Sequence, residues 1–301
     1  MLSAAIKSDN FGVHLRLIGM ALLWGGSWPA GRVVATTMPP LAASAWRFLL
    51  VVFVLSVWLY KRDGAWPRLT FKQWRAITLC GFIGVFGYAV FFLYAMQTVG
   101  AARAALVVTT NPVFTTLLAA WIFKEAFNWK IAVGMVLASL GATIVLTHGA
   151  PWKLLAGDIT RGDALLLGCI ACWVAYTLLG KALMKGIDSL TMTTCTALVG
   201  CVLFWPSTLI IEGDAVWQGV PDKAQFSLLF LALGSTVLAY VWYNEGIAKL
   251  GAGVASSYIS IVPVFGVIAS TLLLHEPIDA SLLIGGALAV TGIIWMNYAR
   301  R

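Results

Sequence analysis

The stretch of sequence that decides the fold occurs twice in this chain. Residues 100–125 read GAARAALVVTTNPVFTTLLAAWIFKE, and residues 251–276 read GAGVASSYISIVPVFGVIASTLLLHE. Each copy contains an apolar run of the length that a membrane-spanning helix needs, roughly 20 residues. A shift of 151 residues aligns identical residues at the two ends and in the middle: Gly100 with Gly251, Pro112-Val113-Phe114 with Pro263-Val264-Phe265, and Glu125 with Glu276.

The same register continues on both sides of this stretch. Further along, the shift of 151 residues pairs Gly134 with Gly285, Ala138 with Ala289, and Gly141 with Gly292. Near the start, a shift of 149 residues pairs Trp24 with Trp173, Gly31 with Gly180, and Arg32 with Lys181. A register kept through successive helices indicates an internal duplication, so the chain consists of two related halves.

The composition is that of a membrane protein. Of the 301 residues, 60% are hydrophobic and 11% are charged, whereas a soluble domain carries roughly 25% charged residues. The mean hydropathy is +0.90. We therefore expect an all-α polytopic membrane protein with short loops and no separate soluble domain. The apolar runs predict ten spans, at residues 15–36, 41–60, 73–98, 102–122, 129–147, 161–181, 189–211, 224–248, 252–273 and 280–298.

The odd number of predicted spans in each half determines how the two halves are oriented in the membrane. Each half contains five predicted spans, so the second half enters the membrane from the side opposite to the first. The two halves are then inverted repeats, related by a pseudo-two-fold axis in the membrane plane. Repeats of this kind underlie alternating access in many transporters. The duplication therefore favours transport over catalysis.

The Lys and Arg residues predict the orientation. With a cytoplasmic N-terminus, fourteen of the 20 Lys and Arg residues lie in cytoplasmic segments or the adjoining helix ends. This bias predicts that both termini are cytoplasmic and that the 148–162 connection is outside. Since the loops are short and organelle-targeting features are missing, we expect a bacterial inner-membrane protein.

Other functional classes find little support in the sequence. The basic residues behind the net charge of +8 punctuate the ends of apolar runs and form no stripe for nucleic acid. Cys169 and Cys172 have C-x-x-C spacing, but apolar residues surround them and we interpret them as buried thiols. The three histidines lie in loops or at span ends, and no catalytic motif accompanies them. We expect no metal or cofactor, and a membrane-embedded enzyme is the weakest alternative.

Several motifs, in this order, resemble those of the EamA-type drug/metabolite transporters. They are the Trp24-Gly25-Gly26-Ser27 start, Arg47 after Pro39-Pro40, Asn111-Pro112, and Glu125 and Glu276 at the ends of the fourth and ninth spans. The resemblance covers nearly the whole chain as two repeats, at residues 11–149 and 158–301.

The resemblance also carries expectations about architecture and solute. It implies ten helices around a central cavity, lined mainly by spans one to four and six to nine. Within the family, the whole chain is similar to exporters of aromatic and other neutral amino acids. The expected partners are such a small-molecule solute and the lipid bilayer, and we expect a monomer. A multidrug or metabolite exporter for other amphipathic compounds is the alternative inside transport.

The candidate solute contacts are polar and aromatic residues near the middle of the predicted spans, where such side chains are usually functional. Ordinary helix packing is the competing interpretation for each aromatic residue. The candidates are Trp24, Ser27, Trp28, Tyr88, Phe91, Tyr94, Asn111, Trp173, Tyr176, Tyr243 and Ser257.

Proline and small residues indicate where helices bend and where they approach closely. Pro112 and Pro263 remove a backbone hydrogen bond inside apolar runs, so a gating or kink role competes with a static bend. Gly134 with Ala138, and Gly285 with Ala289, form small-xxx-small faces that permit close helix contact.

Three charged residues are candidates for coupling or ion pairing. Glu245 is the one acidic residue clearly within a predicted span, four residues before Lys249. It is either a proton carrier or half of a helix-end ion pair. Arg47 has no partner readable from the sequence, and either extends to the interface or meets a carboxylate solute. The first span contains no acid, which argues against antiport of cationic drugs.

Overall fold

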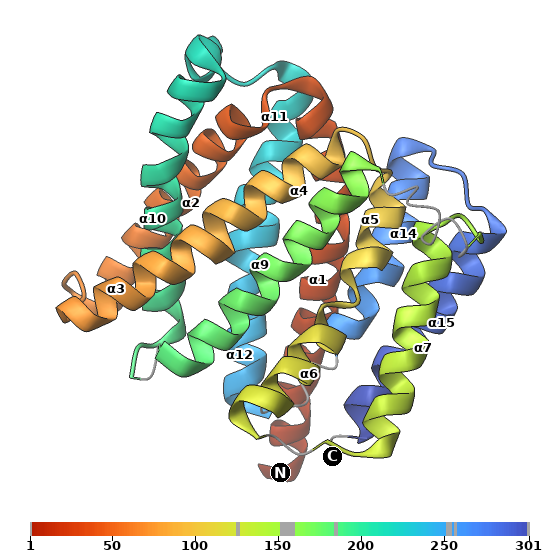
Figure 1. Ribbon diagram of the computed structural model, residues 1–301. Coiled ribbons are helices and arrows are strands. Elements are labelled where there is room, and N and C mark those ends of the chain that lie inside the picture. The colour runs from red at the N-terminus through yellow and green to blue at the C-terminus, as the bar shows by residue number, and fades with distance from the viewer. Residues whose placement is uncertain are drawn as a thin grey trace. The chain divides into compact units, whose positions relative to one another are not determined.

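The computed structural model describes residues 2–124, 127–150, 160–183, 186–250, 255 and 258–299 (Figure 1). All regular elements in these ranges are helical. In the first half of the chain they are α1 (Leu2–Thr37), α2 (Pro40–Asp63), α3 (Phe71–Cys80), η1 (Gly81–Gly87), α4 (Tyr88–Met96), α5 (Ala101–Val108), α6 (Asn111–Phe123) and α7 (Trp129–Leu146). In the second half they are α9 (Arg161–Leu183), α10 (Ser189–Ile211), η2 (Gly213–Gln218), α11 (Asp222–Leu229), η3 (Phe230–Leu238), α12 (Ala239–Leu250), η4 (Tyr258–Ile261), α14 (Val262–Leu274) and α15 (Ala280–Ala299).

The described helices confirm a polytopic membrane protein. Each predicted span corresponds to one helix or to a run of consecutive helices. Two more helices are apolar but shorter, Tyr258–Leu274 and Ala280–Met296. Seven helices are long and apolar enough to cross a membrane by length and composition: Pro40–Asp63, Phe71–Met96, Ala101–Phe123, Trp129–Leu146, Arg161–Leu183, Ser189–Ile211 and Asp222–Tyr243.

Local sequence explains several of the helix ends. Thr70 and Gln73 form a capping box at the start of α3, with each side chain bonded to the other residue's backbone N–H. Asp188 caps α10, and its carboxylate accepts from the backbone N–H groups of Leu190 and Thr191. After α2, Gly64 takes the left-handed conformation, φ 71°, that ends a helix.

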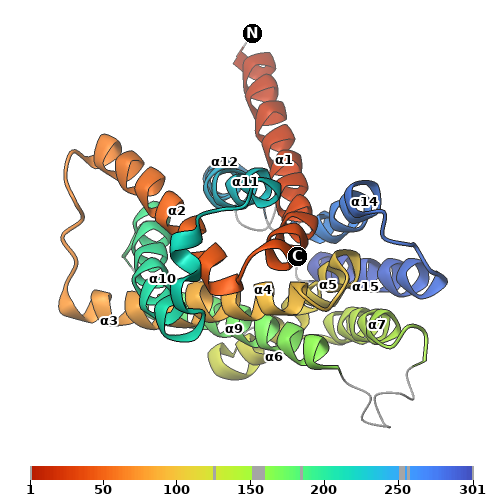
Figure 2. The same ribbon diagram turned by 90° about the horizontal axis from the view of Figure 1, so that it is seen from above.

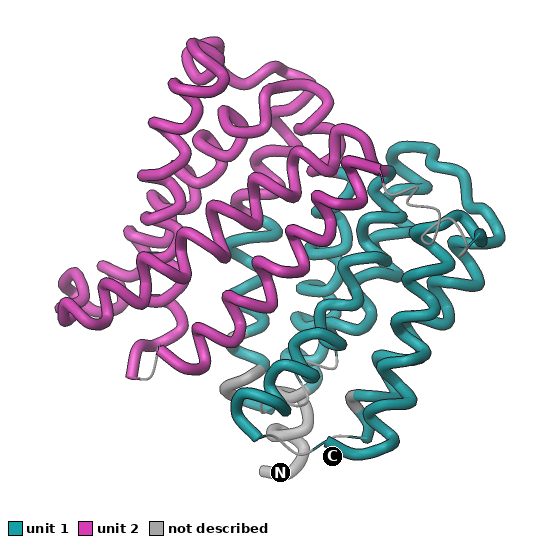
Figure 3. The backbone as a smooth tube through the Cα atoms, viewed as in Figure 1, with its two compact units in different colours: residues 1–29, 100–159, 234–301 teal, residues 30–99, 160–233 magenta. Residues whose placement is uncertain are grey.

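The chain divides into two compact units, each of which contains segments of both halves (Figure 3). Unit 1 comprises residues 1–29, 100–159 and 234–301, and unit 2 comprises residues 30–99 and 160–233. In unit 1, α7 packs on α15 and α5 on α14. In unit 2, α2 packs on α10 and α4 on α9. Inside each unit, therefore, helices of one repeat pack directly on helices of the other.

The contact between α7 and α15 confirms the predicted close approach of small residues. The two helices lie side by side in both views of the molecule (Figures 1 and 2). A Cβ atom added at Gly134 would stand 2.7 Å from the Gly292 carbonyl oxygen, and one added at Gly285 would stand 2.7 Å from that of Gly141. Real Cβ atoms do not approach so closely, so glycine lets the two backbones touch.

Candidate functional site

An aromatic cluster around Trp24 lies in unit 1. The Trp24 indole Nε1 donates a hydrogen bond of 2.9 Å to the backbone oxygen of Ser235, within the π-helical segment η3. Its ring meets that of Tyr240 edge-on, with centroids 5.4 Å apart, and that of Tyr243 at 5.5 Å. A half-buried indole N–H normally finds an acceptor, and here the carbonyl of Ser235 fixes the orientation of the ring.

A second aromatic cluster, around Trp173, lies in unit 2. The Trp173 ring is 5.7 Å from the ring of Tyr88 and 6.2 Å from that of Tyr176. Tyr88 stacks in turn on Phe92 at 6.2 Å. The π-helical segment η1 ends at Gly87, directly before Tyr88. Short π segments inside helices are frequent at functional sites.

The two clusters share repeat-related tryptophans and helix packing, whereas their tyrosines stand at different repeat positions, since Tyr240 corresponds to Ala89 and Tyr88 to Ala239. The shift of 149 residues carries Trp24 onto Trp173, and the π segments η1 and η3 occupy corresponding parts of the third and eighth predicted spans. The helix packing repeats as well. A Cβ atom at Gly19 would stand 2.6 Å from the Trp242 ring, and one at Gly168 would stand 2.6 Å from the Phe91 ring. Phe91 therefore lies close to the backbone of α9 at Gly168.

The predicted fourth and ninth spans are interrupted near their middle. α5 ends at Val108 and α6 begins at Asn111, while the ninth span changes from the 3₁₀ segment η4 to α14 at Val262. Pro112 and Pro263 are thus second residues of new helices, a position where proline fits well. The interruption directly precedes each proline, and a gating or kink role for these prolines stays a prediction.

Asn111 has an unusual environment at the start of α6. Asn111 is 9% exposed. Its side-chain Oδ1 atom has no hydrogen-bond partner among the described residues. The neighbouring hydroxyls are satisfied, since Thr109 donates to the Ala105 carbonyl at 2.7 Å and Thr110 to the Val107 carbonyl at 2.8 Å. A buried acceptor without a donor costs roughly 1–3 kcal/mol, which makes Asn111 a candidate for contact with a polar ligand group.

The other candidates on α1 face helix backbone. Trp28 is 6% exposed, and its Cδ1 atom would be 3.2 Å from a Cβ atom at Gly266 of α14. Ser27 donates to the carbonyl of Trp24 at 2.5 Å, within its own helix. Ser257 lies outside the described residues, and so does Glu125.

Comparison with known proteins decides the family. A model of the EamA-like transporter family matches residues 12–147 and, a second time, residues 160–298. The chain belongs to the EamA-like transporter family. The two matches also show that its repeats occupy the two halves of the chain.

Relatives of this EamA-family chain are named as transporters. It is 26% identical over 95% of its length to "Uncharacterized transporter YyaM" of Bacillus subtilis, of which the match covers 93%. It is 24% identical over 93% of its length to a "Probable terminal-alkyne amino-acid exporter" of Streptantibioticus cattleyicolor, of which 92% is covered. A solved structure titled "Crystal structure of protein" shares the fold, with a TM-score of 0.69, 17% identity, and coverage of 96% and 98%.

Two carboxylates cap distant helices in this EamA chain. Glu212 accepts hydrogen bonds from the backbone N–H groups of Leu41 and Ala42, at 3.0 and 2.9 Å, at the start of α2. The Tyr94 hydroxyl donates to the same carboxylate at 3.1 Å. The candidate Tyr94 therefore belongs to this capping network.

Glu276 acts in the same way on α5. It accepts from the backbone N–H groups of Ala101 and Ala102, at 2.7 and 2.9 Å. Negative charge near a helix N-terminus is stabilising. Sequence reasoning missed both caps, although each glutamate stands within three residues of the end of an apolar span and each capped helix starts after Pro or Gly.

The charged candidate residues form ion pairs or lie against an aromatic ring. The Glu245 carboxylate is 2.5 Å from the Arg16 guanidinium and 3.1 Å from the Lys249 ammonium. The pair with Lys249 was predicted; the pair with Arg16, which joins α1 to α12 of this EamA transporter, was missed. The Arg47 guanidinium lies 5.2 Å from the centroid of the Phe48 ring.

Proposed function

We propose that the chain exports neutral amino acids, preferably those with large apolar or aromatic side chains, by alternating access. In this proposal it lies in a bacterial inner membrane with both termini cytoplasmic, acts as a monomer without cofactor or metal, and is not an enzyme. Its two repeats are residues 11–149 and 158–301. The observation that carries the proposal is the Trp–Tyr contact built once in each unit, Trp24 with Tyr240 and Trp173 with Tyr88.

Aromatic contacts in both units suit a transporter that alternates between two related states. An inverted repeat supplies equivalent elements to the outward and inward forms of a transporter. In the proposal, each of the two clusters offers ring faces that suit an apolar or aromatic side chain. The name of the Streptantibioticus relative, an amino-acid exporter, supports this solute class.

Asn111 and the start of α6 suit the zwitterionic part of an amino acid. The unpaired Oδ1 acceptor matches an ammonium group, and the N-terminal end of the 13-residue α6 favours a carboxylate. Discontinuous helices bind the charged groups of solutes in this way in other transporter folds. Asn111 therefore contributes to affinity for any α-amino acid, whereas the aromatic clusters select the side chain.

The selectivity should be shallow. One ring pair contributes roughly 0.5–1.5 kcal/mol beyond its buried area, and about 1.4 kcal/mol corresponds to tenfold in affinity. Each aromatic contact therefore changes affinity by a few-fold to about tenfold. Thr and Ala would be bound more weakly than Trp and Phe without being excluded.

A competition assay tests the proposal. Purified protein in proteoliposomes is loaded with unlabelled Phe, and counterflow of radiolabelled Phe is measured against a panel of competitors. Trp, Phe and Met should compete best, and Lys, Glu and a sugar phosphate worst. Stronger competition by any of the last three would refute the proposal, and stronger competition by an amphipathic drug would favour the multidrug alternative.

A further inference from the structure

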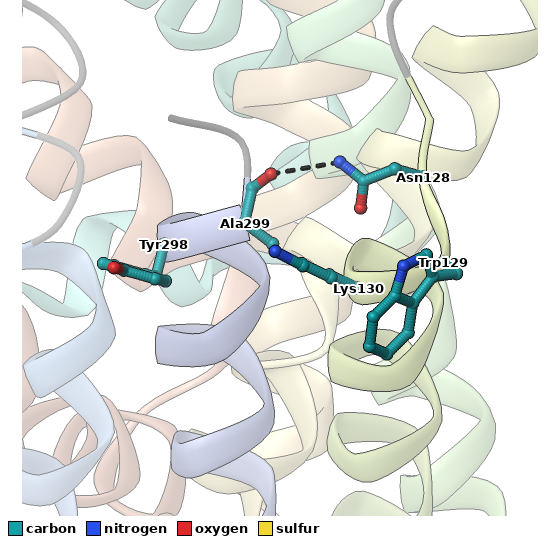
Figure 4. Close-up of a pocket in the computed structure, with 5 residues that line it drawn as sticks. All are labelled: Asn128, Trp129, Lys130, Tyr298 and Ala299. Atoms are coloured by element: carbon teal, nitrogen blue, oxygen red, sulfur yellow. Dashed lines mark hydrogen bonds between the residues drawn. The ribbon is translucent and has the colours of Figure 1, made fainter.

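A cavity of about 390 Å³ lies where α7 begins and α15 ends, within unit 1. Figure 4 shows it at the first turn of α7, opposite the last residues of α15. Its lining residues are Asn128, Trp129, Lys130, Tyr298 and Ala299. Trp129 and Lys130 begin the apolar span Trp129–Leu146, and Tyr298 and Ala299 follow the apolar span Ala280–Met296, so the cavity sits at the ends of both spans.

Two hydrogen bonds join the start of α7 to the end of α15 beside the cavity. The Asn128 Nδ2 amide donates to the Ala299 carbonyl at 3.2 Å, and the Trp295 indole donates to the Lys130 carbonyl at 3.1 Å. Asn128 is also the N-cap of α7, since its Oδ1 atom accepts from the Ile131 backbone N–H at 2.9 Å. These hydrogen bonds therefore hold the lining residues of α7 and of α15 in place.

The lining chemistry is that of a membrane interface. Trp129 is 69% exposed and Tyr298 is 75% exposed, and the two stand on opposite sides of the Asn128–Ala299 hydrogen bond (Figure 4). Exposed Trp and Tyr side chains gather at the level of lipid headgroups. Lys130, also exposed, places a cation between them, and basic pockets between transmembrane helices recognise anionic headgroups.

We propose that this cavity binds the phosphate of an anionic phospholipid headgroup. The Lys130 ammonium pairs with the phosphate, the Asn128 amide edge lies beside it, and Trp129 and Tyr298 flank the glycerol and upper acyl region. A bound lipid would bridge the ends of α7 and α15, the helix pair with the glycine-mediated backbone contact. This inference does not depend on which solute the protein transports.

Lipid binding to detergent-solubilised protein tests the inference directly. Native mass spectrometry measures the apparent dissociation constant of the first bound phosphatidylglycerol, with phosphatidylcholine as the neutral comparison. Lys130→Gln should weaken phosphatidylglycerol binding about fivefold, the change that corresponds to about 1 kcal/mol for one lysine at an anionic membrane surface. Lys130→Arg should retain the binding.

Lys61→Gln is the matched control, because Lys61 is an exposed lysine near the end of α2 in unit 2. It should leave the dissociation constant unchanged. Equal effects of Lys130→Gln and Lys61→Gln would overturn the inference, and so would equal binding of the two lipids. Displacement of the lipid by millimolar inorganic phosphate would instead assign the cavity to a soluble anion.

Discussion

The Trp24 and Trp173 clusters differ in the residues that pack beside the tryptophan at corresponding repeat positions. In unit 1, Ser27 bonds within its own helix, and Ser235 offers its carbonyl to the Trp24 indole. In unit 2, the residue that corresponds to Ser27 is Tyr176, whose ring lies against Trp173, and the residue that corresponds to Ser235 is Gly84. A Cβ atom at Gly84 would stand 2.7 Å from the Tyr176 Cβ atom and closer still to its ring.

The difference teaches that the residue at one position limits the size of the residue that faces it. Where the helix of the third predicted span has Gly84, the facing helix can carry a large ring. Where the eighth has Ser235, the facing residue is the small Ser27. At this pair of positions unit 1 is therefore polar and unit 2 aromatic, and the Trp–Tyr contact of each unit comes from a tyrosine at a different repeat position.

The largest expected effect comes from forcing the unit 1 residue into unit 2. Gly84→Ser places a side chain where the Tyr176 ring lies, and overpacking of this kind costs about 1–3 kcal/mol. Thermal unfolding in detergent, followed by intrinsic fluorescence, should show a lower midpoint. The double variant Gly84→Ser/Tyr176→Ser recreates the unit 1 pair and should recover most of the loss.

The matched control for that comparison is Ser235→Gly. It removes a side chain without creating a clash, and the expected cost is roughly 0.5–1 kcal/mol from the greater backbone freedom of glycine. If Gly84→Ser unfolds at the wild-type temperature, or if the double variant is less stable than the single one, the residue at position 84 does not limit the size of the residue at position 176.

A smaller effect should distinguish the two tryptophans. Trp24→Phe removes the hydrogen bond to the Ser235 carbonyl as well as ring area, whereas Trp173→Phe alters ring contacts alone. A hydrogen bond contributes roughly 0.5–1.5 kcal/mol net, so apparent affinity for Phe should fall two- to tenfold further in Trp24→Phe. Competition in proteoliposomes measures this difference.

Trp121→Phe provides the control for both variants, because Trp121 is 79% exposed and should leave affinity unchanged. Equal losses in Trp24→Phe and Trp173→Phe would mean that the Ser235 hydrogen bond does not orient the ring for the solute. No loss in either would separate both clusters from solute binding.

The smallest effect is expected at Glu245, whose counterpart in the third span is Tyr94. Because the Glu245 carboxylate is engaged by Arg16 and Lys249, we expect it to hold helices and not to carry a proton. Glu245→Gln should retain at least half of wild-type transport. Complete loss of transport with normal folding, together with wild-type transport that follows an imposed pH gradient, would contradict this expectation.

The sequence predicted the spans well because bilayer thickness fixes the length and apolarity of a transmembrane helix. The glycine contacts of α7 and α15 were also predictable, since Gly134, Ala138 and their repeat partners leave no side chain between backbones. The repeat was visible because Trp24 and Trp173 retain their identity across the duplication.

The interior of the site was less predictable. The π-helical turns of η1 and η3 follow from tertiary packing and have no distinct pattern in an apolar run. Partners such as Glu212 and Leu41 are separated by 171 positions in the chain, beyond the reach of local spacing. The unpaired oxygen of Asn111 likewise depends on what surrounds it, which spacing alone does not give.

The two carboxylate caps have a consequence for biogenesis. The N-terminus of α2 acquires its Glu212 partner only after α9 and α10 of the second repeat have been synthesised, and that of α5 acquires its Glu276 partner only after α14. Until then the first N–H groups of both helices lack that acceptor at their membrane ends, where unsatisfied backbone groups are costly. Two helix starts of the first repeat are therefore completed by carboxylates of the second repeat.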